Sequence, residues 1–251
     1  NLNPLGNLEK TDNFQNPFIF RLDPSLTINQ ELEFRLRITS ANYEKTQYLS
    51  TIVNSDYLNM SNDEITITVG SDGSFGYTGG ATIVGDGVRF RGGSSILFEG
   101  GLIVGNSSDY IPSRFRGVAG TDADFKPLQL VRGVNYTQAE TASAGTFNDE
   151  KFSSSARLKI EQTNYFYDSS YTENALLINY QINNISGAPI NGFYIGLIAD
   201  WDIIDYRRNN VSYDNNRQLG VSGSLDTSLR AGLMAISHPA LARHYAIDNQ
   251  D

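Results

Sequence analysis

The chain has 251 residues, of which 39% are hydrophobic and 19% are charged, and its formal net charge of −9 gives a pI near 4.7. This acidity argues against nucleic acid as a partner and against binding to anionic membranes. Cysteine is absent, which excludes disulfides and cysteine-ligated zinc. No apolar run approaches the roughly 20 residues that a membrane-spanning helix needs, so membrane insertion is not expected.

The apolar residues follow the period of β-strands. In residues 31–39, ELEFRLRIT, apolar and charged side chains alternate strictly, as in a half-buried antiparallel strand. Further strands are predicted at residues 64–70, 156–162, 175–184 and 193–203. No segment sustains a 3.6-residue period for three turns, and only residues 238–246 could form a short helix, in which Pro239 suits the first turn. The predicted fold class is therefore all-β, with little helix.

Composition changes near residue 70, where charged alternating strands give way to a glycine-rich and apolar region. Glycine inside strands marks bulges, bends or the close approach of another backbone. We therefore predict two domains: residues 1–69 form a partial immunoglobulin-like domain, and residues 70–251 form a larger antiparallel β-sandwich. Residues 133–155 are small and polar, as in a long surface loop. The centre of the larger core is predicted to contain Trp201, Phe98, Leu102 and Ile195.

The stretch IGLIADWDIID, residues 195–205, concentrates carboxylates beside the single tryptophan. In a strand of period two, Asp200 and Asp202 point away from the face that carries Trp201. Together with Asp205, and with Asp214 further along, they offer the hard oxygen ligands that calcium prefers, although their spacing is not that of an EF-hand. The favoured alternative is structural: the carboxylates accept hydrogen bonds from loop amides and pair with Arg207 or Arg208. A glycosidase-like carboxylate pair is a third interpretation.

Motifs for nucleophilic catalysis are missing. The two histidines, His238 and His244, both lie near the end of the sequence, and no G-x-S-x-G motif is present. The glycines of residues 70–76 lack the lysine and the following helix of a phosphate-binding loop. The chain is therefore not expected to be an enzyme.

Four motifs together resemble the region that follows the catalytic domain in secreted subtilisin-like serine peptidases of Bacteroidota. These motifs are ITITVGSDGSFGY, SSILFEGGLIVG, LLINYQINNISGAPINGFYIGLIADWDI and HYAIDNQD. The resemblance covers most of the chain from about residue 31 onward, and it carries no catalytic residue over, because the G-T-S-x-A serine turn is absent. It implies export by type IX secretion to the outside of a Gram-negative cell. It also implies a sandwich that is truncated at its C-terminal end.

Three functions are consistent with these features. The first is a non-catalytic accessory β-sandwich region that braces its own catalytic domain or neighbouring domains of the parent chain. The second is a calcium-stabilised module that binds a polysaccharide or another protein at the cell surface. The third is a subunit of an extracellular assembly that uses an open strand edge for strand addition.

Overall fold

The computed structural model describes residues 14–23, 25–76, 85–117, 120–167, 172–237 and 243–247. Its architecture is all-β, as predicted, and its sheets are antiparallel. Within these residues no helix has the length and hydrophobicity that crossing a membrane would require. The elements are β1 (Gln30–Ser40), β2 (Tyr43–Val53), β3 (Tyr57–Ser61), β4 (Ile65–Gly70), β5 (Ser74–Phe75), β6 (Val88–Phe90), β7 (Leu97–Gly105), β8 (Arg116–Gly117), β9 (Gly120–Thr121), β10 (Lys126–Val134), β11 (Thr141–Asn148), β12 (Leu158–Phe166), β13 (Leu177–Asn184), β14 (Tyr194–Trp201), the 3₁₀ helix η1 (Tyr206–Arg208), β15 (Asn209–Asp214), β16 (Leu219–Ser224) and β17 (Arg230–Met234).

The chain forms two compact units, residues 1–55 and residues 56–251. This division lies earlier than the predicted one at residues 69/70, because β3 and β4 pair with each other and β4 pairs with β5 and β6. Residues 57–70 therefore belong to the larger unit. In the described part of the first unit, β1 and β2 form a single hairpin, in which the ring of Phe20 lies 4.5 Å from that of Phe34. A partial immunoglobulin-like domain here stays a prediction.

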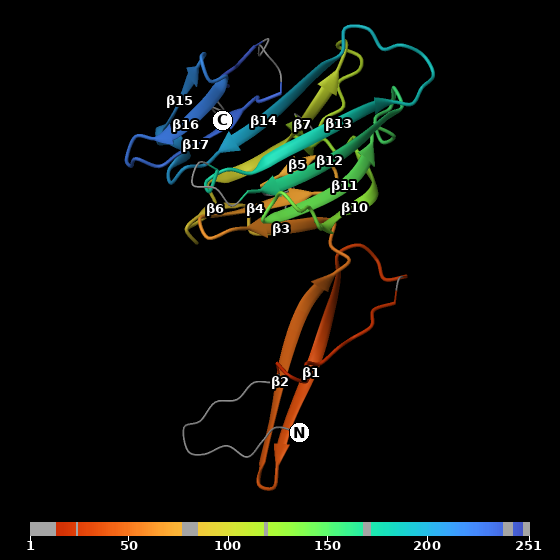
Figure 1. Cartoon of the computed structure of the whole chain (residues 1–251), viewed down its shortest axis with the longest axis vertical. Coiled ribbons are helices and arrows are strands. Elements are labelled where there is room, and N and C mark those ends of the chain that lie inside the picture. The colour runs from red at the N-terminus through yellow and green to blue at the C-terminus, as the bar shows by residue number, and fades with distance from the viewer. Residues whose placement is uncertain are drawn as a thin grey trace. The chain divides into compact units, whose positions relative to one another are not determined.

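The second unit is a sandwich of two antiparallel sheets (Figure 1). One sheet has the strand order β14-β7-β5-β4-β3, with β6 also paired to β4, and the other has the order β10-β11-β12-β13. Their facing surfaces form the core. At one place Leu102 of β7 packs with Phe147 of β11 and Ile160 of β12, and at another Val69 of β4 packs with Phe166 of β12.

A smaller sheet, β15-β16-β17, packs against a third apolar cluster. Phe75, Leu97 and Ile203 are buried there, and Trp201 and Leu233 are partly buried against them. Trp201 is thus half-buried beside this cluster and does not lie at the centre of the main core. The strands β8 and β9 form a separate two-stranded pair.

The prediction of the core is also wrong for two other residues. Phe98 and Ile195 are both exposed, whereas Leu102 is fully buried as predicted. Phe98 is the extra residue at a register shift, because Asp200 pairs with Glu99 and Trp201 pairs with Leu97, and this irregularity breaks the alternation that would place it on the face of Leu102. Ile195 is exposed for a different reason, because β14, the strand that carries it, lies at the end of its sheet.

The predicted loop at residues 133–155 contains a central strand. β11 pairs with β10 on one side and β12 on the other. Its small residues are buried, including Ala142 and Ser143, so a strand of low hydrophobicity occupies the interior of the sheet. Residues 238–242 of the predicted short helix, with His238, lie outside the described residues, and residues 243–247 form no helix.

One strand glycine has the predicted role of allowing close approach. A Cβ atom at Gly101 would lie 1.9 Å from the backbone carbonyl oxygen of Arg114. Any side chain at Gly101 would therefore displace the backbone that crosses β7 there.

Candidate functional site

Two of the four predicted calcium ligands cap local turns. Asp205 precedes η1, and its carboxylate accepts a hydrogen bond from the backbone N–H of Arg207 over 3.2 Å. Asp214 ends β15 and accepts hydrogen bonds from the backbone N–H groups of Asn216 and Arg217 over 3.0 and 3.1 Å. The Arg217 guanidinium adds an ion pair of 2.8 Å. The backbone hydrogen bond from Arg217 is the largest cause that lowers the pKa of Asp214. Both carboxylates therefore hold the backbone of their own turns.

The other two predicted ligands lie at the end of β14. Asp200 is the register partner of Glu99 on β7, so the two carboxyl groups are cross-strand neighbours on one face. Glu99 is only 3% exposed. Asp202 follows the strand, and its backbone N–H donates to the carbonyl of Ile96 over 3.0 Å. Within the described residues, no three Asp, Glu or His side chains gather as a metal site would need, and a calcium site stays a prediction.

Of the two arginines predicted to pair with these carboxylates, one does so. Arg207 lies 3.9 Å from Asp205, whereas Arg208 pairs with Asp226 over 2.8 Å. Glu99 was missed by the sequence reasoning. Its signal was a single charge inside the apolar run ILFEGGLIVG, since a carboxyl group at such a position in a strand either reaches solvent or is buried beside polar partners.

A buried carboxylate that no motif predicted organises another part of the sandwich. Asp149 is 1% exposed and follows β11. Its Oδ2 accepts hydrogen bonds from the Tyr110 hydroxyl and from the N–H of Ala156, each over 2.7 Å. Its Oδ1 accepts from the N–H of Leu158 over 2.8 Å and from the Ser155 hydroxyl over 3.0 Å. Four donors thus satisfy this buried charge, and they close the loop between β11 and β12.

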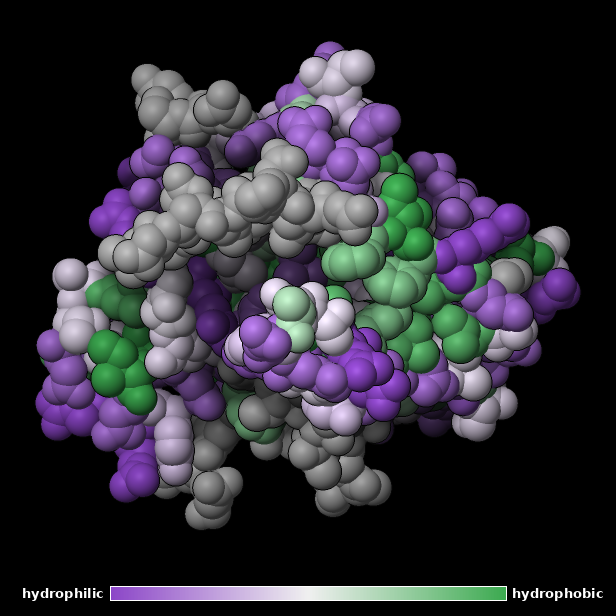
Figure 2. Space-filling view, turned by 90° about the horizontal axis from the view of Figure 1, so that it is seen from below, coloured by the Kyte–Doolittle hydropathy of each residue, from purple (hydrophilic) through white to green (hydrophobic). Residues whose placement is uncertain are grey.

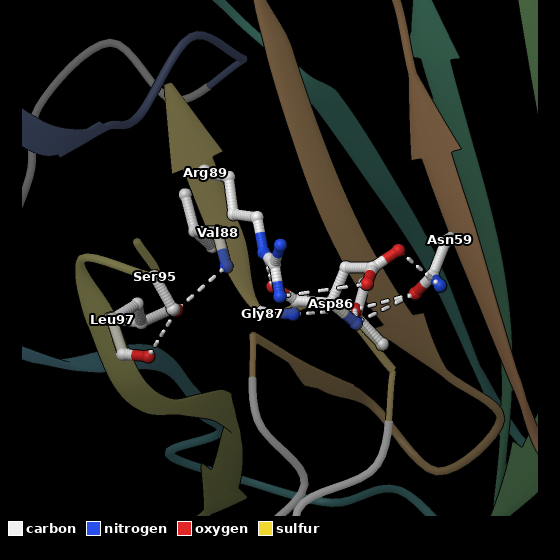
Figure 3. Close-up of polar contacts among 8 residues, drawn as sticks. Asn59, Asp86, Gly87, Val88, Arg89, Ser95 and Leu97 are labelled. Carbon is white, nitrogen blue, oxygen red and sulfur yellow. Dashed lines mark hydrogen bonds and ion pairs between the residues drawn. The ribbon is translucent and has the colours of Figure 1, made fainter. Parts of the chain in front are cut away.

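A second polar network fixes the entry of the chain into β6, as Figure 3 shows. Asn59 donates to the carboxylate of Asp86 over 2.7 Å, while Arg89 donates to the carbonyl of Asp86 over 2.7 Å. The Thr68 hydroxyl donates to Asn59 Oδ1 over 2.7 Å and accepts the N–H groups of Asp86 and Gly87 over 2.8 and 2.9 Å. The network therefore holds the residues before β6 against β3 and β4.

The edge strand β14 exposes apolar side chains on the face of the sheet that forms the core at the neighbouring strand β7. Ile195 and Leu197 are the register partners of Val104 and Leu102, so they lie on the face of the sheet that is turned toward the sandwich interior. Val104 and Leu102 are buried, yet Ile195 is 58% exposed and Leu197 is 44% exposed. We call Ile195, Leu197 and the backbone edge of β14 that faces away from β7 the β14 surface.

The β14 surface arises from the order of the strands. β14 ends the six-stranded sheet, and β13 ends the sheet that packs against it. In the described part of the chain, β7 is the strand that pairs with β14; the other backbone edge of β14 has no hydrogen-bonded strand there, and β17 lies close to part of β14. Large apolar residues are also exposed elsewhere on the molecule, as the green areas of Figure 2 show. The β14 surface differs because it continues a buried core outward to an open edge.

Two open depressions lie beside residues 133–142, and the second also reaches residues 58–61. Glu140 lines both of them and is the one ionisable carboxyl group among their lining residues. Neither depression brings together an acid, a base and a nucleophile in the manner of an active site.

The fold and the β14 surface together define an all-β protein built on a β-sandwich with an open apolar edge. The chain matches no protein-family model, no curated protein and no solved structure. A relationship to the peptidase-associated region is therefore supported by the sequence motifs alone.

Proposed function

We propose that this chain is a non-catalytic structural module that docks against a neighbouring segment of its parent polypeptide through the β14 surface. The observation that carries the proposal is the exposure of Ile195 and Leu197 on the interior face of β14, beside the buried residues Val104 and Leu102. Burying a side chain of this size contributes about 1.5–3 kcal/mol, so covering both residues favours a docked state substantially.

An extended segment is the partner that this surface fits. A strand that pairs with the open edge of β14 gains main-chain hydrogen bonds, and its alternate side chains can cover Ile195 and Leu197. A segment with apolar residues at every second position would also extend the sandwich by one strand. In this way the module would fix the position of a neighbouring domain without taking part in chemistry.

The arrangement of the polar residues supports a structural role. Asp149, Asp205 and Asp214 each accept hydrogen bonds from the backbone of their own loops. The ring of His244 is stacked on that of Tyr213, with their centroids 4.7 Å apart and their planes at 12°. These side chains are engaged in packing and in turn formation, which favours a scaffold over a hydrolase.

The parent protein is proposed from the sequence resemblance. The four motifs support a secreted subtilisin-like peptidase as the parent, its catalytic domain or a neighbouring domain as the partner, and the outside of a Gram-negative cell as the location. A calcium-stabilised module that binds a polysaccharide or another protein is the second candidate, and it predicts that calcium stabilises the fold.

Thiol accessibility tests the docking proposal directly, because the chain has no cysteine of its own. Leu197→Cys places a thiol on the β14 surface, and Leu225→Cys places a matched thiol at an exposed leucine just after β16. Each variant is made in the 251-residue chain and in the whole protein encoded by the same reading frame. We expect the thiol at position 197 to react at least about tenfold more slowly in the whole protein, as burial of a thiol implies. The thiol at position 225 should react equally in both, and equal reactivity at position 197 would contradict the proposal.

A further inference from the structure

The charges of β1 are placed symmetrically about Phe34, with negative charges on one side and positive charges on the other. In residues 31–37, ELEFRLR, two glutamates precede Phe34 and two arginines follow it at mirrored positions. On an isolated strand this order places like charges next to each other on one face, Glu31 beside Glu33 and Arg35 beside Arg37. When the same strand runs antiparallel to itself, every glutamate comes to lie opposite an arginine.

The register of the hairpin shows which residues could make that pairing. Ser40 and Tyr43 are the last register pair of the hairpin, and only Ala41 and Asn42 lie between them. The pair that flanks a two-residue loop is hydrogen-bonded, and hydrogen-bonded and non-hydrogen-bonded pairs alternate in an antiparallel ladder, so the even-numbered residues of β1, among them Phe34, direct their backbone groups toward β2. The odd-numbered residues, among them Glu33 and Arg35, direct theirs away from β2, toward the edge of β1 beside which the described residues place no strand; we call this the open edge of β1.

The side chains on the charged face are available for this pairing. Among the described residues, Glu31, Glu33 and Arg35 form no ion pair with another side chain, and all three are exposed. Arg37 pairs with Glu44 over 2.9 Å in a site that is exposed on both sides. The opposite face of β1 is apolar and half-buried at Leu32, Phe34 and Leu36, and there Phe20 of the same chain lies against Phe34.

We propose that the open edge of β1 pairs antiparallel with β1 of a second copy of this chain, with Phe34 opposite Phe34. In this register Glu33 faces Arg35 and Glu31 faces Arg37 on both sides of the two-fold axis. Those residues form the hydrogen-bonded pairs, because their backbone groups point to the open edge. The two Phe34 residues form the central non-hydrogen-bonded pair, in which opposite side chains are closest.

The paired hairpins form a four-stranded sheet in the order β2-β1-β1-β2. An isolated two-stranded hairpin is marginally stable in water, whereas three or more strands with an apolar face are stable. The second copy also covers an edge whose backbone groups pair with no strand among the described residues. This self-association uses a different unit of the chain from the β14 surface and does not depend on the docking proposal.

Charge reversal tests the pairing. In sedimentation at physiological ionic strength, from about 1 µM to about 1 mM, the range of weak interfaces, we expect the 251-residue chain to form dimers. Arg35→Glu places like charges at both central pairs and should weaken the dimer at least about tenfold. The control Lys45→Glu makes the same change of charge on β2, away from the open edge of β1, and should leave the dimer constant within about threefold. A chain that stays monomeric over this range overturns the proposal.

Complementary variants separate pairing from a general loss of stability. Glu33→Arg alone and Arg35→Glu alone should each self-associate weakly, but a mixture of the two should form heterodimers, because each repulsive pair becomes attractive. The double variant Glu33→Arg/Arg35→Glu should regain self-association. A double variant that remains monomeric while its circular dichroism is unchanged contradicts the register, even if the single variants behave as expected.

Disulfide trapping tests the register itself. The Cα atoms of a hydrogen-bonded pair lie about 5.5 Å apart, within the range that disulfides bridge, whereas residues i and i+2 of one strand lie about 7 Å apart. The variant Glu33→Cys/Arg35→Cys should therefore give a covalent dimer on oxidation. The matched variant Thr46→Cys/Tyr48→Cys carries the same spacing on β2 and should stay monomeric. Equal cross-linking of both variants would indicate random collision and overturn the proposal.

Discussion

The hydroxyl of Tyr110 and the carboxylate of Asp149 meet in the core of the sandwich over 2.7 Å, although 39 residues separate them in the sequence. This contact joins the turn after β7 to the loop after β11. Asp149 is also the acceptor for two backbone amides of that loop. One buried carboxylate therefore holds together two segments that the sequence places far apart.

Asp149→Ala should destabilise the protein strongly. Removal of the carboxylate leaves the buried donors of Tyr110, Ala156 and Leu158 without a partner, at a cost of about 3–5 kcal/mol in the free energy of unfolding. Chemical denaturation followed by fluorescence measures this loss. Asp63→Ala, at an exposed carboxylate, is the control and should change stability by less than about 0.5 kcal/mol. A loss below about 1 kcal/mol at Asp149 would contradict its structural role.

Stability should decrease with pH in the alkaline range. Burial, and then the hydrogen bond to Asp149, raises the pKa of Tyr110 above its ordinary value of about 10. Above about pH 10 the unfolded chain loses this proton while the folded chain keeps it, so unfolding becomes more favourable as pH rises. Burial raises the pKa of Tyr180 as well. Tyr110→Phe should therefore reduce the slope of unfolding free energy against pH above pH 10, and an unchanged slope would exclude Tyr110 as its source.

Two leucines that are register partners should respond differently to truncation. Leu102 and Leu197 lie opposite each other on β7 and β14, but the first is buried and the second is exposed. Leu102→Ala should lower the free energy of unfolding by about 2–5 kcal/mol, as truncation in a packed core does. Leu197→Ala should lower it by less than about 1 kcal/mol. Similar losses in the 251-residue chain would mean that the β14 surface is covered within the chain itself.

Calcium should leave the melting temperature unchanged if the carboxylates of residues 200–214 are structural. An ion bound with a Kd tenfold below the calcium concentration would stabilise the fold by about 1.4 kcal/mol and raise the melting temperature by about 3 °C. Differential scanning calorimetry with calcium and with EDTA distinguishes these outcomes. A rise that Asp202→Asn abolishes would restore the calcium-stabilised binding module as the preferred function.

The sequence predicts the strands better than it predicts what covers them. Strict alternation in residues 31–39 and 64–70 identifies β1 and β4, because apolar and polar side chains there reflect two different faces. β11 was missed because its buried positions hold small and polar residues, which composition associates with loops. Its burial comes from the strands on both sides of it.

The candidate site also depends on long-range strand pairing, which the local sequence does not predict. Alternation places Ile195 on the core face of β14, and this is correct, but the exposure of Ile195 depends on where β14 lies in the strand order. Long-range pairing also decides the environment of Asp149 and Glu99, which no local pattern distinguishes from surface carboxylates. Asp205 and Asp214 were recognisable because their hydrogen-bond donors follow within three residues.

Amide hydrogen exchange along β14 tests the scaffold proposal most directly. Open edges exchange on the timescale of local opening, while amides paired on a covered edge exchange more slowly. The measurement compares residues 195–199 in the 251-residue chain with the same residues in the whole protein, and β12 serves as the internal reference. The proposal predicts that the β14 amides that point away from β7 are strongly protected in the whole protein alone, and that β12 is protected equally in both. Equal exchange of β14 in the two samples would contradict docking at this surface.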